Sequence, residues 1–399
     1  MKNQFFVRLD LVRGLGQGVL ETGFSVFIIL IAIRFWDAPD SYKAALSGGG
    51  SLGLMLTPIA SAVISRGRLT LSKKCALLLA SSAILIFAAS LSSTILLFTL
   101  FLVMAQICLS QVPSLMIQIY STVYNPNERG KKISLNLIAS TIGGLFSSFV
   151  FGTYLDTGGA DYRAVLWGMS VAALISSFSV FKMNHESNSR SGIPGSETVL
   201  QSISNPMRDF LFLKILLAWM ILGFGAIMTF PLRVEYLSRE DQLNLSNQEI
   251  ALITVVIFFG AKVMSMYMWG KLFDRMHFMK FRILLNIQMI VAILIYFNSP
   301  SLLGVMIGSL LAGSVMGGAN LAWNLWVTKL APEGREKDYM SVHMALTGIR
   351  GSAAPFAGYA LEGVIGFTGV SLVSATMIFL SCILFASTLK EPRLLGKRG

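Results

Sequence analysis

The stretch FTGVSLVSATMIFLSCILFASTL, residues 367–389, contains 23 residues and not one charged side chain. A helix of about 20 apolar residues is long enough to cross the hydrocarbon core of a bilayer. Similar stretches recur along the whole 399-residue chain, of which 54% is hydrophobic and only 13% charged. A soluble domain carries about 25% charged residues. The composition therefore predicts an all-α polytopic membrane protein.

Twelve spans are predicted, six on each side of a long polar interruption at 182–208, KMNHESNSRSGIPGSETVLQSISNPMR. This composition is typical of a flexible linker. The predicted organisation is a six-helix bundle over 1–181, a cytoplasmic linker over 182–208, a second six-helix bundle over 209–389 and a basic tail over 390–399. The spans are 11–33, 43–65, 74–92, 94–120, 132–154, 163–181, 209–232, 248–270, 281–298, 300–328, 339–363 and 367–389.

The net charge of +12 comes from basic residues that lie in small groups between the apolar runs. This distribution follows the positive-inside pattern and argues against a nucleic-acid-binding face. Most of the 32 Lys and Arg residues fall on one side of the predicted membrane. We therefore expect a multi-pass protein of the plasma (inner) membrane with both termini in the cytoplasm. The outer loops hold only Arg34, Lys43, Arg163, Arg233 and Arg239.

The sequence contains no motif for disulfide bonds, metal binding, nucleotide binding or nucleophilic catalysis. The three cysteines lie in apolar runs without disulfide or metal spacing, and no phosphate-binding GxxxxGK[ST] loop occurs. Nor is there a cluster of metal ligands or a nucleophile elbow. We expect no cofactor, no metal and no enzymatic activity, and a chain that acts as a monomer in the bilayer.

The two halves repeat one another. The loop YNPNERGKK at 124–132 matches LAPEGREKD at 330–338 with an offset of 206 residues, which pairs Arg129 with Arg335. The same offset pairs Gly152 with Gly358. Together with the equal number of spans, these matches predict a duplicated six-helix unit with pseudo-two-fold symmetry.

A loop motif follows the eighth span and consists of Gly270, Leu272, Asp274 and Arg275. The corresponding loop of the first half keeps Arg66 but has Ser61 and Ser65 where the motif has Gly and Asp. With the twelve spans and the central linker, the chain resembles the major facilitator superfamily of secondary transporters over essentially its whole length.

The resemblance implies two bundles that rock about a site near the bilayer midplane. It also implies that the motif acts as a gate, with Arg129 and Arg335 of the repeated loops as further members. Gly270 would allow close helix approach, while Asp274 would latch the cytoplasmic side through a helix N-terminus and a nearby arginine. The alternative is that Asp274 and Arg275 are ordinary interface charges.

Polar residues within the spans form stripes at helical spacing. Arg13, Gln17 and Glu21 recur at i, i+4 and i+8, which places them on one face of a helix. By the same reasoning, and because intramembrane charges mark functional sites, we predict a set of substrate-binding or coupling residues. These are Gln17, Glu21, Gln111, Lys262, Asn320, Asn324 and Arg350.

Arg350 and Glu21 each allow two interpretations. Arg350 lies in a span rich in small residues, so it either binds an anionic substrate group or is held by an ion pair or a free carbonyl near Pro355. Glu21 is the one carboxylate that we expect deep within a span. It either exchanges a coupling proton or is held ionised by a cation.

The predicted function is secondary active transport of a small polar, preferably anionic, solute by alternating access, with proton coupling. The partners are that solute, protons and the lipid bilayer, without nucleic acid. Two alternatives stay open. One is efflux of drug-like or lipid-like amphiphiles by the same fold. The other is a transporter-like membrane receptor or assembly factor that moves no solute.

Overall fold

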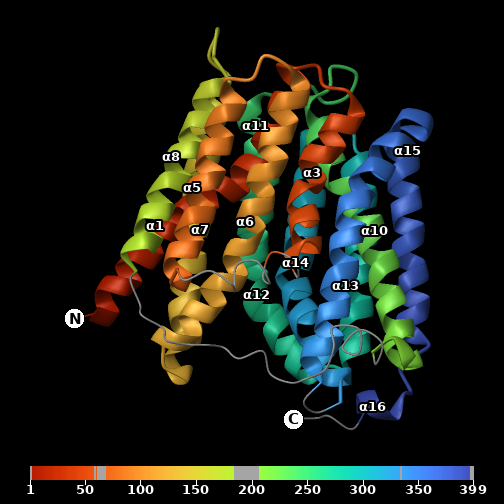
Figure 1. The fold of residues 1–399 in the computed structure, drawn as a ribbon. Helices are drawn as coiled ribbons and strands as arrows, with labels where there is room; N and C mark the ends of the chain where they lie inside the picture. The colour runs from red at the N-terminus through yellow and green to blue at the C-terminus, as the bar shows by residue number, and fades with distance from the viewer. Residues whose placement is uncertain (1, 58–59, 61–68, 184–205, 333–334, 396–399) are drawn as a thin grey trace. The chain divides into compact units, whose positions relative to one another are not determined.

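A computed structural model describes residues 2–57, 60, 69–183, 206–332 and 335–395. Every element in those residues is helical, and they contain no strand (Figure 1). The chain divides into two compact units. Unit 1 comprises Met1–Gly192 and Leu245–Val255, and unit 2 comprises Ile193–Asn244 and Val256–Gly399. The predicted linker 182–208 falls largely outside the described residues.

Unit 1 begins with one long helix in three parts. These are α1 (Lys2–Thr22), a π-helical segment η1 (Gly23–Phe27) and α2 (Ile28–Arg34). Then follow α3 (Asp40–Met55), α5 (Leu71–Ser90), α6 (Ile95–Val123), α7 (Pro126–Leu155) and α8 (Arg163–Lys182). The short helix α11 (Asn247–Ala251) also packs in this unit, against α7. The division therefore departs from the predicted domains at Leu245–Val255.

Unit 2 contains the 3₁₀ turn η2 (Pro206–Arg208) and α10 (Phe210–Ser238). The π-helical segment η3 (Leu252–Ile257), of which only the last two residues belong to this unit, leads into α12 (Phe258–Arg275). The remaining helices are α13 (Phe278–Asn298), α14 (Leu302–Leu330), α15 (Glu336–Ala386) and α16 (Pro392–Leu395).

Ten helices of the described chain are long and apolar enough to cross a membrane. Two features explain the difference from the twelve predicted spans. Helix α3 has only 16 residues, fewer than the roughly 20 that cross the hydrocarbon core, and α15 contains two membrane-crossing segments. These join at Gly366, whose φ of 66° and ψ of 177° interrupt the helix, a backbone conformation that glycine adopts without penalty. The prediction of an all-α membrane protein is confirmed.

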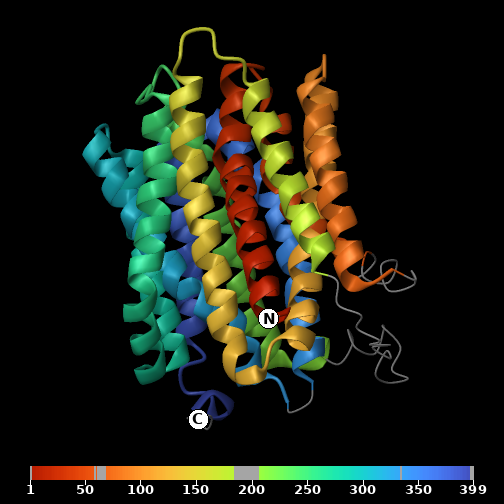
Figure 2. The same ribbon diagram turned by 90° about the vertical axis from the view of Figure 1, so that its left-hand side faces the viewer.

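The helices pack in the same order within each unit. In unit 1, α1 packs on α7, α3 and α5 pack on α6, and α5 packs on α8. In unit 2, α10 packs on α15, α12 and α13 pack on α14, and α13 packs on α15. Figure 2 shows α1, in red, running between α7 and α8. This shared order is what the internal repeat predicts.

Glycines bring the backbones of paired helices together. A Cβ at Gly143 of α7 would collide with the carbonyl oxygen of Leu15 of α1, and one at Gly358 of α15 with the carbonyl oxygen of Met228 of α10. In a membrane, where lipid tails are as apolar as Leu, close packing replaces the hydrophobic effect as the force that joins helices. Gly143 and Gly358 therefore set the spacing of corresponding helix pairs.

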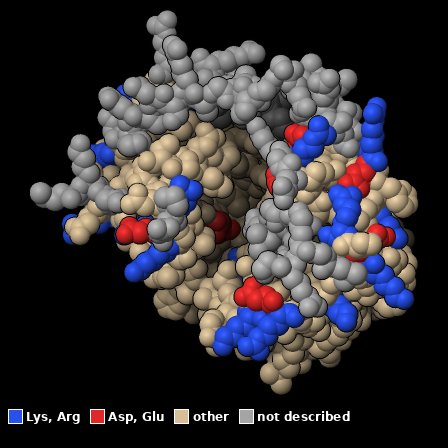
Figure 3. Space-filling view, turned by 90° about the horizontal axis from the view of Figure 1, so that it is seen from below, with Lys and Arg blue, Asp and Glu red and all other residues tan. Residues whose placement is uncertain are grey.

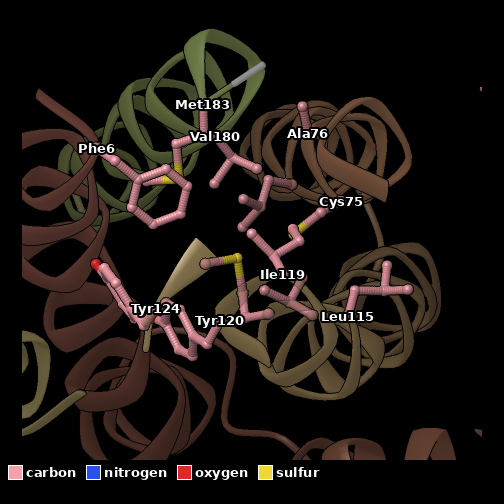
Figure 4. Packing of buried hydrophobic residues seen from close by; sticks show 12 residues of the cluster. Phe6, Cys75, Ala76, Leu115, Ile119, Tyr120, Tyr124, Val180 and Met183 are labelled. Carbon is pink, nitrogen blue, oxygen red and sulfur yellow. The ribbon is translucent and has the colours of Figure 1, made fainter. Parts of the chain in front are cut away.

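Apolar side chains from α1, α5, α6 and α8 fill the core of unit 1 (Figure 4). Phe6 meets Tyr124 edge to face at 5.4 Å, and Tyr124 stacks on Tyr120 at 5.6 Å between ring centroids. The outer faces are apolar as well, with Ile84 of α5 and Phe178 of α8 strongly exposed. Such exposure is unfavourable in water and suits a lipid-facing surface.

Candidate functional site

A buried ionic network crosses unit 1 beside this core. Arg13 Nε donates to Asp10 Oδ1 at 2.9 Å, and the two residues are only 5% and 2% exposed. Tyr120 donates its hydroxyl hydrogen to Asp10 and accepts a hydrogen bond from Arg13 Nη2 at 2.8 Å. Asn136 of α7 donates to the Asp10 carbonyl at 2.6 Å. Arg13 is thus a paired, structural charge.

Asp10 corrects the expectation that Glu21 is the one carboxylate deep within a span. The predicted first span begins at residue 11, directly after Asp10, because a charged residue does not fit the edge of an apolar run. Helix α1 in fact begins at Lys2, and Asp10 lies one turn before Arg13 on the same helix.

The polar stripe of α1 forms a relay away from this network. Arg13 Nη1 donates to Gln17 Oε1 at 2.8 Å, and Gln17 Nε2 donates to Glu21 Oε1 at 2.7 Å. Ser140 of α7 donates to the other Glu21 oxygen at 3.5 Å. Within the described residues, Glu21 has no ion pair with Arg13 or any other cation, and its side chain is exposed. The π-helical segment η1 begins two residues later, and such segments often mark functional sites.

A cavity of about 230 Å³ lies among α1, α3, α5, α6 and α8 of unit 1. One part of its wall is polar and another apolar. The polar side chains include Gln17 and Glu21, as predicted, and also Gln106, which sequence reasoning missed. The lining residues are Arg13, Gln17, Leu20, Glu21, Phe24, Gly50, Leu79, Gln106, Leu109, Ser110, Val112, Pro113 and Ser176.

Of the two glutamines of α6, Gln106 lines this cavity, whereas Gln111, the predicted site residue, does not. Gln111 Nε2 donates to the Gly53 carbonyl of α3 at 2.8 Å, which makes it a link between helices. Gln106 also contacts α3, donating to the Leu46 carbonyl at 2.8 Å and accepting from the Gly50 amide at 3.0 Å. Its place on the cavity wall comes from the facing helix, which the spacing within α6 cannot show.

Arg350 of α15 is held by α10 in unit 2. Its Nη1 donates to the Trp219 carbonyl, and its guanidinium lies where a Cβ at Gly223 would stand. The predicted carbonyl near Pro355 is not its partner. Gly223 therefore makes the space that this side chain occupies.

A second arginine, Arg282 of α13, lies next to Arg350 and was missed by the sequence analysis. It is only 4% exposed, and its guanidinium lies over the Trp219 ring, 4.5 Å from the ring centroid. Arg282 Nε donates to Asn286 Oδ1 at 2.9 Å, and Asn286 Nδ2 in turn donates to Ser381 at 3.1 Å. Arg282 is the second residue of the predicted span 281–298, at its edge, whereas α13 begins four residues before it.

His343 completes this aromatic and cationic cluster. It is fully buried, and its ring lies 5.1 Å from the ring of Trp326, 5.5 Å from Trp323 and 6.0 Å from Trp219. By the repeat offset of 206 residues, Trp219 is the counterpart of Arg13 in the sequence, and Trp326 is the counterpart of Tyr120. Arg13 and Tyr120 are hydrogen-bonded in unit 1, and the two tryptophans are in ring contact at 5.9 Å in unit 2.

The remaining predicted site residues are Lys262, Asn320 and Asn324. Lys262 of α12 is half-buried, with its ammonium 5.4 Å from the centroid of the Phe259 ring. Asn320 of α14 is also half-buried. The side chain of Asn324 lies outside the described residues. Neither Lys262 nor Asn320 has a contact with Arg350 among the hydrogen bonds and ring contacts described above.

The predicted gating residues lie near the helix ends. Asp274 and Arg275 are exposed at the end of α12, and a Cβ at Gly270 would meet nothing within 4 Å. No neighbouring helix therefore approaches Gly270 closely among the residues that the structure describes. Arg129 donates to the Ser121 carbonyl at 3.1 Å, capping the end of α6. Arg335 is the residue that precedes α15. The first-half copy, Ser61, Ser65 and Arg66, lies outside the described residues.

Comparison with known proteins agrees with this architecture. The nucleoside transporter NupG shares 12% identity and a TM-score of 0.79, over 97% of this chain and 99% of that chain. A D-xylose-proton symporter shares 13% identity and a TM-score of 0.74, over 100% of both. A bacterial homologue of the lysosomal transporter Spinster shares 14% identity and a TM-score of 0.70, over 98% of both. At these identities the likeness concerns the fold.

A search of curated proteins finds no match. The family model described as Major Facilitator Superfamily matches residues 236–398, which cover most of the second half. The match and the fold agree with the internal repeat and the twelve spans. The chain is a multi-pass membrane protein that has the fold of these transporters, and the model described as Major Facilitator Superfamily matches most of its second half.

Proposed function

We propose that this protein is a secondary active transporter that moves a small polar solute by alternating access, coupled to protons. The observation that carries the proposal is the cavity of unit 1, which holds Gln17, Glu21 and Gln106 inside membrane-spanning helices. Polar groups at that depth are unfavourable unless they meet water or a polar ligand. The structural neighbours named for nucleosides and for D-xylose with protons support the same class of solute.

Glu21 is the proposed proton carrier. Its neighbours Gln17 and Ser140 are neutral hydrogen-bond donors, so protonation of the carboxylate breaks no ion pair. Arg13 already has Asp10 as its counter-ion. Glu21 therefore has no paired cation among the described residues, and a proton carrier requires such a carboxylate.

The proposed setting is the plasma (inner) membrane, with a monomer whose two termini are cytoplasmic. Basic residues support this orientation, and Lys and Arg side chains gather on the face that Figure 3 shows from below. A reporter fused to either terminus that is active only in the cytoplasm tests the orientation. Activity of one fusion and silence of the other would contradict an even number of spans.

The decisive experiment is solute exchange in liposomes. Purified protein is first screened by thermal shift against nucleosides, sugars and organic acids, and the compounds that stabilise it are then tested in counterflow with a labelled copy. Saturable exchange that requires the protein supports transport. Specific binding without any exchange would contradict transport and favour a receptor.

A second candidate, efflux of amphiphiles, is favoured by one observation. The same cavity is also lined by the apolar side chains of Leu20, Phe24, Leu79, Leu109 and Val112, beside the polar stripe of α1. An amphipathic molecule would match both surfaces. Competition separates the two candidates, because an efflux protein would bind lipophilic cations or dyes more tightly than sugars or nucleosides.

A further inference from the structure

Unit 2 contains a group of buried polar atoms that have no hydrogen-bond partner. They lie on α10, α13, α14 and α15, within the cluster around Trp219. Buried polar groups are nearly always hydrogen-bonded, so a local concentration of exceptions requires an explanation. The atoms are Nε1 of Trp219 and Trp326, Nη1 of Arg282, Nε of Arg350, both ring nitrogens of His343, and Oγ1 of Thr347.

Nearly all of these groups can donate a hydrogen bond. Indole and guanidinium nitrogens donate and cannot accept, imidazole does both through different nitrogens, and a hydroxyl does both. The cluster therefore lacks acceptors in particular. A bound group that satisfies it must present several acceptor atoms at once.

The charges indicate the same kind of ligand. Arg282 and Arg350 are close enough to repel each other electrostatically, and no carboxylate bonds either of them among the residues that the structure describes. Unit 1 shows the contrast, since its buried Arg13 is neutralised by Asp10. Two neighbouring buried cations without a counter-ion are unfavourable unless an anion joins them.

The cluster is also held in place. Trp219 contacts both arginines, with its ring under Arg282 and its carbonyl accepting from Arg350. Asn286 accepts a hydrogen bond from Arg282 and is itself fixed by its bond to Ser381. Arg282 is fully buried whereas Arg350 is half-buried, so a ligand would reach Arg350 first.

We propose that this cluster binds an oxyanion, the carboxylate or phosphate group of the transported solute. Planar guanidinium groups match the paired oxygens of either anion. The indole rings of Trp219 and Trp326 would pack against the apolar part of the same molecule. This inference rests on the proposed transport function and assigns the solute to the class of organic anions, with Arg282 as a binding residue.

Binding to the purified full chain in detergent tests the proposal without transport. The probes are benzoate, phenyl phosphate and inorganic phosphate, with benzamide as the neutral counterpart and sodium chloride at equal ionic strength. We expect at least one oxyanion to raise the unfolding midpoint saturably, while benzamide and chloride do not. Its dissociation constant should rise about tenfold or more in Arg282→Gln and in Arg350→Gln.

Two further variants separate a binding role from a folding role. Lys280→Gln removes an exposed cation from the same helix and should leave the affinity unchanged. Arg282→Lys keeps the charge but loses the planar fork, and should bind more weakly than the wild type and more tightly than Arg282→Gln. Equal affinity in the wild type and in a folded Arg282→Gln would overturn the proposal.

Other outcomes also count against it. If no oxyanion shifts the wild type and Arg282→Gln is simply more stable, the cluster holds water only. If only vesicles of phosphatidylglycerol produce the shift, the cluster binds lipid and not solute. Oxyanion binding without counterflow would leave this site standing and refute the transport function. Counterflow of a neutral solute without oxyanion binding would refute this site and leave the transport function standing.

Discussion

The guanidinium of Arg282 lies over the ring of Trp219, 4.5 Å from its centroid, while the carbonyl of that tryptophan accepts a hydrogen bond from Arg350. One residue thus orients two cations from two other helices. A cation over an indole face gains about 0.5–2 kcal/mol, the larger value applying when it is desolvated. That gain does not neutralise the charge, which is why Arg282 still requires an anion.

Gly223→Ala should disturb Arg350 without unfolding the protein. The added methyl group would occupy the place of the guanidinium, so the arginine must leave its bond to Trp219. Alanine is otherwise the better helix former by about 0.5–1 kcal/mol. We expect weaker oxyanion binding together with an unfolding midpoint near that of the wild type. Gly260→Ala, where a Cβ meets nothing within 4 Å, is the matched control and should leave binding unchanged.

Asp10→Asn should destabilise unit 1 strongly. The change leaves the Arg13 charge buried and unpaired, and breaking a buried pair in this way costs about 3–5 kcal/mol. A lower unfolding midpoint, measured by tryptophan fluorescence in detergent, is the expected result. The double variant Asp10→Asn/Arg13→Gln removes both charges and should recover most of the loss. A double variant as unstable as the single one would show that the ion pair is not the reason.

Glu21→Gln should separate coupling from exchange. Glutamine fills nearly the same volume and still accepts from Gln17, but it cannot carry a proton. In liposomes we expect counterflow to continue and pH-driven accumulation to disappear. Glu240→Gln, at an exposed position, serves as the control and should retain both. Accumulation by Glu21→Gln at the wild-type level would remove this residue from the coupling role.

Helix α16 should stay attached to unit 2 down to unusually low pH. Arg393 donates to Asp209 at 2.9 Å and to the Leu330 carbonyl at 2.7 Å, and Tyr339 also donates to Asp209. Burial alone would raise the pKa of the Asp209 carboxyl. The bonds from the Phe212 amide, Arg393 and Tyr339 outweigh burial and lower this pKa below its ordinary value. The contact is therefore complete above the ordinary pKa of about 3.9 and is lost only as the pH falls through the lowered one.

A nitroxide label at Leu394→Cys, in a Cys108→Ser background, measures this contact. We expect an immobile label from pH 8 to about 4, and a mobile one at pH 7 in Asp209→Asn. Asp241→Asn removes a different ion-paired aspartate, bonded to Arg239, and should leave the label immobile. Release of the label near neutral pH in the wild type would refute the assignment.

The membrane fold was predictable because hydropathy and length decide it. Each predicted span overlaps a helix, and the repeat predicted the shared packing order of the two units. Asp10 and Arg282 were both missed as buried charges. Asp10 lies just before the predicted span 11–33 and Arg282 at the edge of the predicted span 281–298, and it is the neighbouring helices that bury them.

The candidate site was less predictable, since spacing within one helix identifies a face but not its partner. The stripe Gln17 and Glu21 does line a cavity. Gln111 instead bonds a carbonyl of the adjacent helix, and Gln106 takes the place on the wall. The partner of Arg350 is a main-chain carbonyl 131 residues away, and no side-chain pattern indicates such a bond.

Because Arg13 and Trp219 occupy corresponding places, the two descendants of the ancestral half are no longer interchangeable. In the first half the buried Arg13 is neutralised by Asp10. In the second half no carboxylate bonds the buried Arg282 or Arg350 among the residues that the structure describes. A tandem protein made of two first halves would carry its own counter-ions throughout and offer a solute nothing to neutralise. If both proposals hold, divergence after duplication has given the halves different tasks, with the proton carrier Glu21 in the first half and the oxyanion site in the second.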